Sequence, residues 1–299
     1  MKKIGLHEKC PCNSGAKFKD CCIHNHKPRK GTLRLAYEIK GNDPFVARMF
    51  FQMTQLREHV FKTEERDSFD KKHHSVFQNL YEAKIAKEKC IDLMKDHREK
   101  VKNYDGVTYS NDGLLTVNKP IDNELNMLFK DFFIRGNIAL KALVKLCGIM
   151  GYNMSFAFTD DKKFEDKKKK FLKNHPEPEF IQFCNSIEDM REKWYKIFIF
   201  IRNKIEHDGF TLPEVTYLLG KTDNIKVFYP TLNNQSLNEI LKICWENLFQ
   251  ITEEMIIFSF SKKLPSPLVI VEIPETKRDL GNPIRYVVSI QGLQNGPKL

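Results

Sequence analysis

Apolar side chains recur at intervals of three or four residues over most of the chain, which is the period of an amphipathic helix. In residues 44–62 this period places Phe45, Met49 and Met53 on one face. The same pattern predicts further helices over residues 68–101, 122–148, 179–208 and 236–260. The fold class expected from this pattern is mainly α, with the helices packed as a bundle.

Four segments depart from the helical period and favour short strands instead. Residues that favour strands flank turn sequences in 107–117 and again in 215–229, which predicts two β-hairpins. Residues 268–273 and 285–290 are predicted to form two short strands near the C-terminus. These β pieces are expected to decorate the helical body rather than to form a sheet domain.

Breaks in the pattern divide the chain into four predicted regions. Residues 1–30 comprise a cysteine-rich knuckle and a basic linker, and 31–120 are helical with a hairpin. Residues 121–264 are predicted to form a helical bundle, and 265–299 a short β-rich tail. The pattern leaves open whether 31–120 form a separate domain or extend the bundle.

The chain carries a surplus of positive charge. It has 299 residues, with 49 Lys+Arg against 39 Asp+Glu, and so a formal net charge of +10. Such a surplus suits a polyanionic partner such as RNA. Part of it lies in the lysine-rich segment 160–170, which is interpreted as a solvated loop or a frayed helix, with phosphate contact as the less favoured alternative.

The hydrophobic content excludes several classes of protein. With 41% hydrophobic residues the chain can bury a sizeable core, so wholesale disorder is not expected. No apolar run approaches the roughly 18 residues that a membrane span needs. Residues 1–10 have no apolar segment of the kind found in signal peptides. We therefore expect a soluble, cytoplasmic protein with no membrane partner.

Cysteines occur in two settings along the chain. Four stand alone in apolar stretches and are expected to be small buried hydrophobes: Cys90, Cys147, Cys184 and Cys244. The other four, which lie close together near the N-terminus, are Cys10, Cys12, Cys21 and Cys22. Disulfides need an oxidising compartment, whereas four thiolates joined by a short loop suit tetrahedral Zn²⁺. His24 or His26 could replace Cys22 as the fourth ligand.

The N-terminal cysteine cluster resembles the SEC-C zinc motif, C-x-C-x8-C-[CH]. The resemblance is carried by Cys10-Pro-Cys12-Asn-Ser-Gly-Ala-Lys-Phe-Lys-Asp-Cys21-Cys22, with Asn13 where Gly is commoner. It implies a structural zinc ion held by Cys10, Cys12, Cys21 and Cys22. A closed site with four ligands has no open position for catalysis, so the motif implies recruitment to RNA, a ribosome or a protein partner.

Near the end of the helix predicted at 179–208, a group of polar residues follows a very apolar run. Arg202, Asn203, Glu206 and His207 fall within the last turns before Gly209. One interpretation is structural: Arg202 and Glu206 form a surface ion pair, and His207 interacts with the dipole at the helix C-terminus. The other is that Arg202, Asn203 and His207 form a catalytic site.

The segment Ile-Arg-Asn-Lys-Ile-Glu-His, residues 201–207, resembles the R-N-x-x-x-H signature of HEPN-domain proteins. The resemblance covers roughly residues 121–264 and implies an all-α bundle. Many members of that family are metal-independent endoribonucleases of toxin–antitoxin and antiphage systems, and others only bind. Arg202, Asn203 and His207 match the positions expected of an active member.

The chemistry that this resemblance implies is consistent with the residues present. RNA supplies its own nucleophile, the 2′-OH, and a histidine can exchange the proton near neutral pH. The arginine fork can hold the phosphate as negative charge grows, and Asn203 can position either group. One chain offers one such histidine, so a homodimer that joins two Arg202/His207 sets is expected.

Two other functions remain open at this point. One is a non-catalytic zinc adaptor that binds RNA or protein, and the other is a HEPN partner of a nucleotidyltransferase, with nucleotide or an antitoxin on the basic face. Arg135 and Asn137 are possible polar companions of Arg202. The remaining histidines of the first long helix are interpreted as plain surface residues: His73, His74 and His97.

Overall fold

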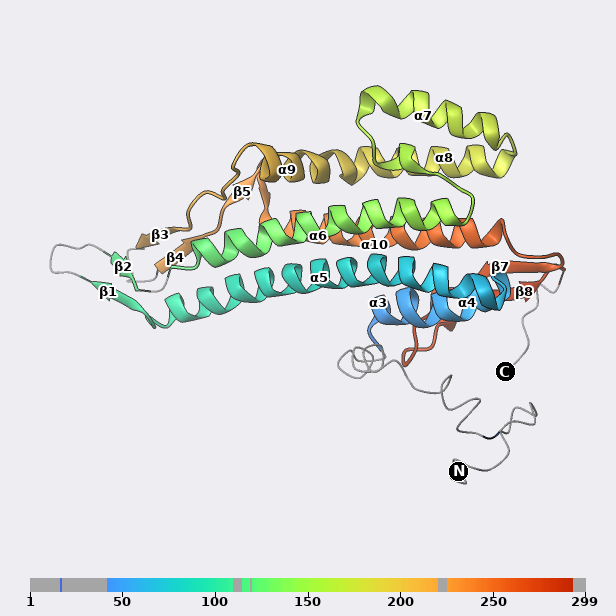
Figure 1. Ribbon diagram of the computed structural model, residues 1–299. Helices are drawn as coiled ribbons and strands as arrows, with labels where there is room; N and C mark the ends of the chain where they lie inside the picture. The colour runs from blue at the N-terminus through green and yellow to red at the C-terminus, as the bar shows by residue number, and fades with distance from the viewer. Residues whose placement is uncertain (1–16, 18–41, 110–114, 119, 220–224, 293–299) are drawn as a thin grey trace. The chain divides into compact units, whose positions relative to one another are not determined.

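The computed structural model describes residues 17, 42–109, 115–118, 120–219 and 225–292 (Figure 1). Their contacts separate the chain into two compact units. One comprises Met1–Met53 with Val271–Val287, and the other comprises Thr54–Ile270 with Val288–Leu299. The prediction of a mainly α fold with small β pieces is confirmed.

The larger unit is built on long helices that lie side by side. Helix α5 (Thr63–Lys102) packs along α6 (Asp122–Ile149), and α6 also contacts α9 (Lys196–His207) and α10 (Leu237–Ser261) (Figure 1). These helices are the ones that the apolar period predicted. Within the described residues no helix is long and apolar enough to span a bilayer.

Aromatic side chains fill the space around α6. The ring centroids of Phe129 and Phe133 lie 5.0 Å apart, and Phe133 lies 5.2 Å from Phe198 of α9. Gly136 permits this close approach, because a Cβ at that position would meet Leu248 and Phe198 at 3.0 Å. The face of α6 that carries Gly136 therefore fixes the spacing of α9 and α10 around the core.

The helix predicted at 179–208 is continuous but contains a π-helical turn. It runs through α8 (Pro178–Met190), the π segment η4 (Arg191–Tyr195) and α9. A π turn inserts one extra residue per turn and rotates the residues that follow it. Trp194 and Tyr195 of η4 are both buried, so the insertion lies in the core just before the polar end of α9.

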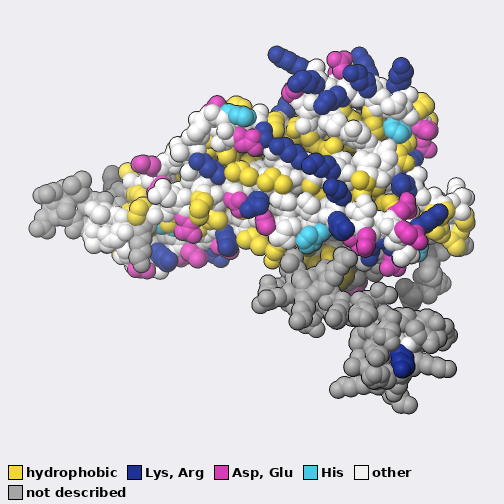
Figure 2. Space-filling model, viewed as in Figure 1, with side chains coloured by type: hydrophobic (Ala, Val, Ile, Leu, Met, Phe, Trp, Pro, Cys, Tyr) yellow, Lys and Arg dark blue, Asp and Glu magenta, His cyan; other side chains and the backbone are white. Residues whose placement is uncertain are grey.

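The lysine-rich segment is an ordered helix rather than the predicted loop or frayed helix. Helix α7 covers Asp161–Asn174, and the Asp160 side chain caps it by accepting a hydrogen bond from the Lys163 N–H at 3.0 Å. Its apolar side chains, Phe164 and Phe171, are buried. Regular Phe spacing and the N-cap thus outweigh the repulsion among the lysines, which Figure 2 shows gathered over α7.

Buried Arg191 attaches the start of α7 to η4. Its Nη1 donates to the Ala157 carbonyl at 2.7 Å, and its Nη2 donates to Asp161 at 2.9 Å. The guanidinium also lies 4.4 Å from the centroid of the Phe164 ring. An arginine that is 3% exposed and so fully engaged serves the packing of the helices.

The strands of both predicted hairpins pair as expected, and their turns, 110–114 and 220–224, lie outside the described residues. Strands β1 (Val107–Tyr109) and β2 (Leu115–Val117) pair antiparallel, as do β3 (Thr216–Leu219) and β4 (Ile225–Phe228). The short strands β5 (Thr231–Leu232) and β6 (Gln235–Ser236) make a third antiparallel pair that leads into α10. Ser236 then caps α10 in a capping box with Glu239.

His97 attaches the second hairpin to α5, so its assignment as a surface residue is wrong. It is 5% exposed, with the Tyr217 hydroxyl 3.0 Å from Nε2 and the Tyr229 hydroxyl 3.1 Å from Nδ1. Tyr229 donates its proton to the Met94 carbonyl at 2.5 Å. It therefore accepts from Nδ1–H, and in the neutral imidazole Nε2 accepts from the Tyr217 hydroxyl.

The predicted burial of two other histidines and of the isolated cysteines can also be compared with the structure. His73 is buried and stacks on Phe69 at 5.4 Å, so the prediction of a surface position is wrong for it, whereas His74 is exposed as expected. The four isolated cysteines are free and buried, which confirms the prediction. Desolvation raises the pKa of the Cys90 thiol to about 12, so it stays protonated and inert.

Helix α5 begins earlier than the predicted start at residue 68. It begins at Thr63, because the Glu65 carboxylate accepts a hydrogen bond from the Lys62 N–H at 3.1 Å and caps the first turn. Residues 44–60 are helical as predicted, in three segments: α3 (Pro44–Val46), the π segment η2 (Ala47–Gln52) and α4 (Met53–Val60).

The smaller unit is organised by a buried glutamine. Gln52 Oε1 accepts hydrogen bonds from the backbone N–H groups of Arg285 and Tyr286, at 2.6 and 2.7 Å. Glu272 pairs with Arg278 and Arg285, and the hydrogen bond from Arg285 holds the pKa of this carboxyl below its usual value. The strands predicted near the C-terminus, β7 (Leu268–Glu272) and β8 (Tyr286–Ile290), form a two-stranded sheet.

Candidate functional site

The polar end of α9 is held in place by the segment that follows it. Helix α9 ends at His207, and Gly209 has φ +60°, the left-handed conformation that glycine adopts readily at helix C-termini. The Phe210 ring lies 6.2 Å from that of Phe129 in α6. The Leu212 N–H donates to the side chain of Asn126 at 3.1 Å. The turn that carries His207 is therefore attached to α6.

Arg202 lies between α9 and α6 and is almost fully engaged. With its amide oxygen turned toward α9, Asn137 of α6 accepts hydrogen bonds from Nε and Nη2 of Arg202, both at 3.0 Å. Nη1 donates to Asn203 Oδ1 at 2.8 Å, and Nη2 forms an ion pair with Glu206. The Arg202 side chain is only 13% exposed. Its charge and its orientation are thus set by three neighbours.

Glu206 contacts both Arg202 and His207, the first and last residues of the R-N-x-x-x-H sequence. Its Oε2 pairs with Arg202 and lies 4.0 Å from His207 Nε2. The His207 side chain is 69% exposed, so the imidazole faces solvent while the guanidinium is packed against α6. The cluster of Asn137, Arg202, Asn203, Glu206 and His207, called the α9 cluster below, therefore presents one exposed imidazole and one shielded cation, both in contact with Glu206.

The predicted site residues Arg202, Asn203 and His207 lie on consecutive turns of one helix end. Arg202 and Asn203 are in contact, and His207 approaches them through Glu206. Of the two expected companions, Asn137 contacts Arg202, whereas Arg135 pairs with Glu82 at 2.7 Å and with Asp131 at 3.2 Å.

Glu206 is expected from the sequence only as an ion-pair partner, and the structure gives it that contact and a second one. The spacing of four residues from Arg202 signals the ion pair. The approach of Glu206 to His207 has no such signal, because neighbouring positions on an ideal helix point about 100° apart. It arises where the helix ends, at residues 206–208.

The predicted zinc ligands lie outside the described residues. Cys10, Cys12, Cys21 and Cys22 all belong to the segments 1–16 and 18–41, as do the alternatives His24 and His26. In the part of the chain that the structure describes, no group of three or more His, Cys, Asp or Glu could hold a metal ion. Four cysteine thiolates are nevertheless a donor set that fits zinc.

Comparison with known proteins identifies one part of the chain. Residues 8–23 match the SEC-C motif, a zinc-binding type of motif. No curated protein and no solved structure matches the chain. The match supports the resemblance of the N-terminal cysteines to that motif, and it does not include the α9 cluster.

Proposed function

We propose that the protein is a metal-independent endoribonuclease of the HEPN type, whose α9 cluster cleaves RNA through attack by the 2′-OH. The observation that carries the proposal is the fixed position of the Arg202 guanidinium, held from α6 by Asn137 and joined through Glu206 to the exposed imidazole of His207. A cation that is already oriented stabilises developing phosphate charge without reorganising during the reaction. Defence against phage or a toxin–antitoxin system is the role that this activity suits.

Each residue of the cluster has a part in the proposed reaction. His207 removes the proton from the 2′-OH or returns one to the departing 5′ oxygen. Arg202 binds the phosphate, whose oxygens take the place that the Glu206 carboxylate occupies in the free protein. Asn137 and Asn203 keep the guanidinium in position meanwhile. The products are a 2′,3′-cyclic phosphate and a 5′-OH end.

A homodimer completes this chemistry. One chain supplies one histidine at the cluster, whereas the reaction gains from both a base and an acid. Phe200 is 49% exposed and lies seven residues before His207, hence on the same face of α9. A two-fold contact between α9 helices would cover Phe200 and bring two His207 side chains together.

The N-terminal motif is proposed to act in recruitment. Cys10, Cys12, Cys21 and Cys22 would hold a structural zinc ion, which would order this segment for docking to RNA or to a protein partner such as an antitoxin. Zinc there supplies no step of the cleavage, because a closed tetrahedral site leaves no coordination position for substrate.

A non-catalytic adaptor is the second candidate, and one observation favours it. Every polar group of Arg202 is satisfied within the chain, by Asn137, Asn203 and Glu206, as in a residue that only joins two helices. On that account the α9 cluster would be structural, and the basic surface would bind RNA without cutting it.

Product analysis distinguishes the two candidates. The purified full chain is incubated in EDTA with a structured RNA and with the same RNA carrying 2′-O-methyl groups. The proposal predicts cleavage of the unmodified RNA to 2′,3′-cyclic phosphate ends and none of the methylated RNA, since the nucleophile is blocked. Binding of both RNAs without cleavage of either would establish the adaptor and refute the nuclease.

A further inference from the structure

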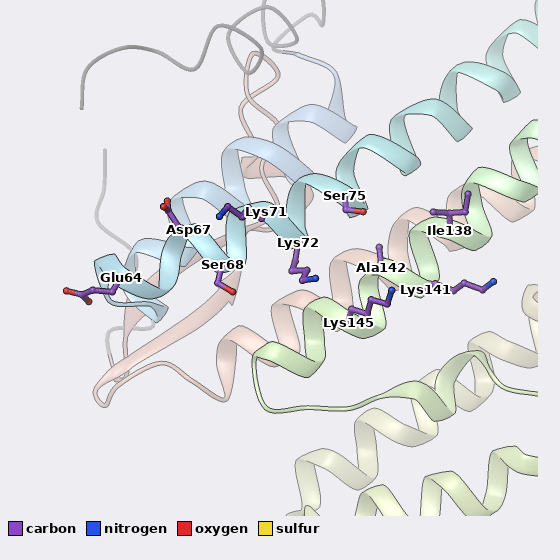
Figure 3. A pocket seen from close by; sticks show the side chains of 10 residues that line it. All are labelled: Glu64, Asp67, Ser68, Lys71, Lys72, Ser75, Ile138, Lys141, Ala142 and Lys145. Atoms are coloured by element: carbon purple, nitrogen blue, oxygen red, sulfur yellow. The ribbon is translucent and has the colours of Figure 1, made fainter. Parts of the chain in front are cut away.

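A groove on the surface of the larger unit lies between α5 and α6 (Figure 3) and has a volume of about 670 Å³. Lys71 and Lys72 line it from α5, and Lys141 and Lys145 line it from α6. Its apolar part is formed by Ile138 and Ala142. Lysines of two different helices thus line one hollow of the size that takes a nucleotide.

Some lysines elsewhere on the helices have a carboxylate partner. Lys84 pairs with Glu88, Lys168 with Glu188, and Lys196 with Glu192. Among the described residues, no carboxylate pairs with any of the four groove lysines. Lys141 and Lys145 are also four residues apart on one helix, a spacing at which like charges repel. An anion bound in the groove would relieve that repulsion.

Two acidic residues also line the groove, at the N-terminal end of α5. In Figure 3 the Glu64 carboxylate points away from the lysines, whereas Asp67 lies beside Lys71. Ser68 and Ser75 add two hydroxyl groups to the lining. Ammonium and hydroxyl groups are the donors that proteins offer to phosphate oxygens, and an apolar floor suits a ribose or a base.

The groove is connected to the α9 cluster through one turn of α6. Asn137 contacts Arg202 on one side of this helix, and its neighbour Ile138 lines the groove on another. We propose that the α5–α6 groove binds the sugar–phosphate backbone of RNA, at a distance from the cleavage cluster, and this proposal rests on the proposed function for the identity of the polyanion. A small polyphosphate shares the same chemistry and is tested separately.

Lysine footprinting locates the bound phosphates. The full chain with His207→Ala, which binds without cleaving, is acetylated with and without a single-stranded RNA oligonucleotide, and the modified lysines are read by mass spectrometry. Protection of Lys72, Lys141 and Lys145 is expected, with exposed Lys89 and Lys95 of α5 remaining reactive. Equal protection of all five would overturn the groove as a site.

Salt dependence gives an independent measure in matched variants. Lys141→Gln/Lys145→Gln removes two groove charges, and Lys89→Gln/Lys95→Gln removes two exposed charges from α5. The negative slope of log K against log salt for single-stranded RNA should become less steep by about 1.4 in the groove variant, since each phosphate contact contributes about 0.7. It should stay unchanged in the control, and equal slopes in the two variants would contradict the proposal.

Tripolyphosphate separates the two sources of phosphate. If it protects the groove lysines and RNA does not, the ligand is a small polyphosphate and the RNA proposal is wrong. The outcome is also distinct from that of the cleavage assay. A chain that protects its groove but cuts no RNA loses the nuclease proposal alone, and a chain that cuts RNA with an unprotected groove loses the groove alone.

Discussion

At the scale of single residues, the α9 cluster depends on how one guanidinium is shared. Arg202 has a rigid fork of donors, and Asn137, Asn203 and Glu206 take up different parts of it. Asn137 is 7% exposed and lies on the buried side of the fork, whereas Asn203 is exposed. The two asparagines therefore differ in what their removal leaves behind, because only the buried side is closed to water.

Replacing Asn137 should cost more than replacing Asn203. Asn137→Ala leaves Nε of Arg202 without an acceptor at the α6 interface and Nη2 with Glu206 alone, at a cost of about 1–3 kcal/mol. Asn203→Ala exposes Nη1 to water and should change stability by within about 0.5 kcal/mol. Urea unfolding of both variants measures the difference. Equal effects would show that Asn137 does not hold Arg202 from the buried side.

At the scale of elements, His97 makes the attachment of the second hairpin sensitive to pH. Burial lowers the pKa of the His97 imidazole, and nearby Asp122 and Lys100 act on it in opposite directions. Burial also raises the pKa of the Tyr217 hydroxyl to about 12. The hydroxyl of Tyr217 is therefore protonated at neutral pH and can donate to a neutral His97.

Acid should loosen this attachment. Because the folded pKa of His97 lies below the unfolded value of about 6.5, its contribution to stability is complete above that value and is lost as pH falls through the folded pKa. The free energy of unfolding of the wild type should fall faster below about pH 6.5 than that of His97→Gln, which cannot titrate. Parallel curves for the two proteins would contradict the assignment.

Most helices and strands could be predicted from the sequence. The features that could not be predicted have physical causes. The periods of α6 and α10 and the strand patterns of β3 and β4 are local properties, so they appear in the sequence. The burial of His97 depends on side chains that other elements bring, Tyr217 and Tyr229. No window of sequence contains those partners.

The candidate site could be predicted in part for the same reason. The spacing of Arg202 and Glu206 on one helix is a local property and is enough to predict their ion pair. Asn137 could be predicted only as a candidate companion, because its contact with Arg202 depends on Gly136 letting α6 approach α9. The exposure of His207 follows from the end of α9 at Gly209.

At the scale of the whole molecule, part of the net charge of +10 can be assigned to particular surfaces. Lysines gather over α7 (Figure 2), and four more line the α5–α6 groove. Both surfaces belong to the unit that contains the α9 cluster. A cleavage site formed by two copies would therefore have positively charged surfaces on the same unit of each copy, which favours RNA over neutral ligands.

Dimerisation through α9 makes a specific prediction for Phe200. Phe200→Glu should convert a dimer to a monomer and abolish cleavage, because a buried carboxylate at the contact would be unpaired. Phe228→Glu is a matched control, since Phe228 is 50% exposed on β4 against 49% for Phe200. Light scattering after gel filtration gives the mass. A wild type that is monomeric yet cleaves RNA would exclude the dimer.

The most direct test of the central claim is the single-turnover rate of RNA cleavage in EDTA for the wild type, His207→Ala and His59→Ala. His59 is an exposed histidine of α4, so its removal controls for the loss of a surface imidazole. The account predicts a rate about 10²–10⁴-fold lower for His207→Ala, as for loss of general acid–base catalysis, and an unchanged rate for His59→Ala. Equal rates for all three proteins, or cleavage by none, would contradict it.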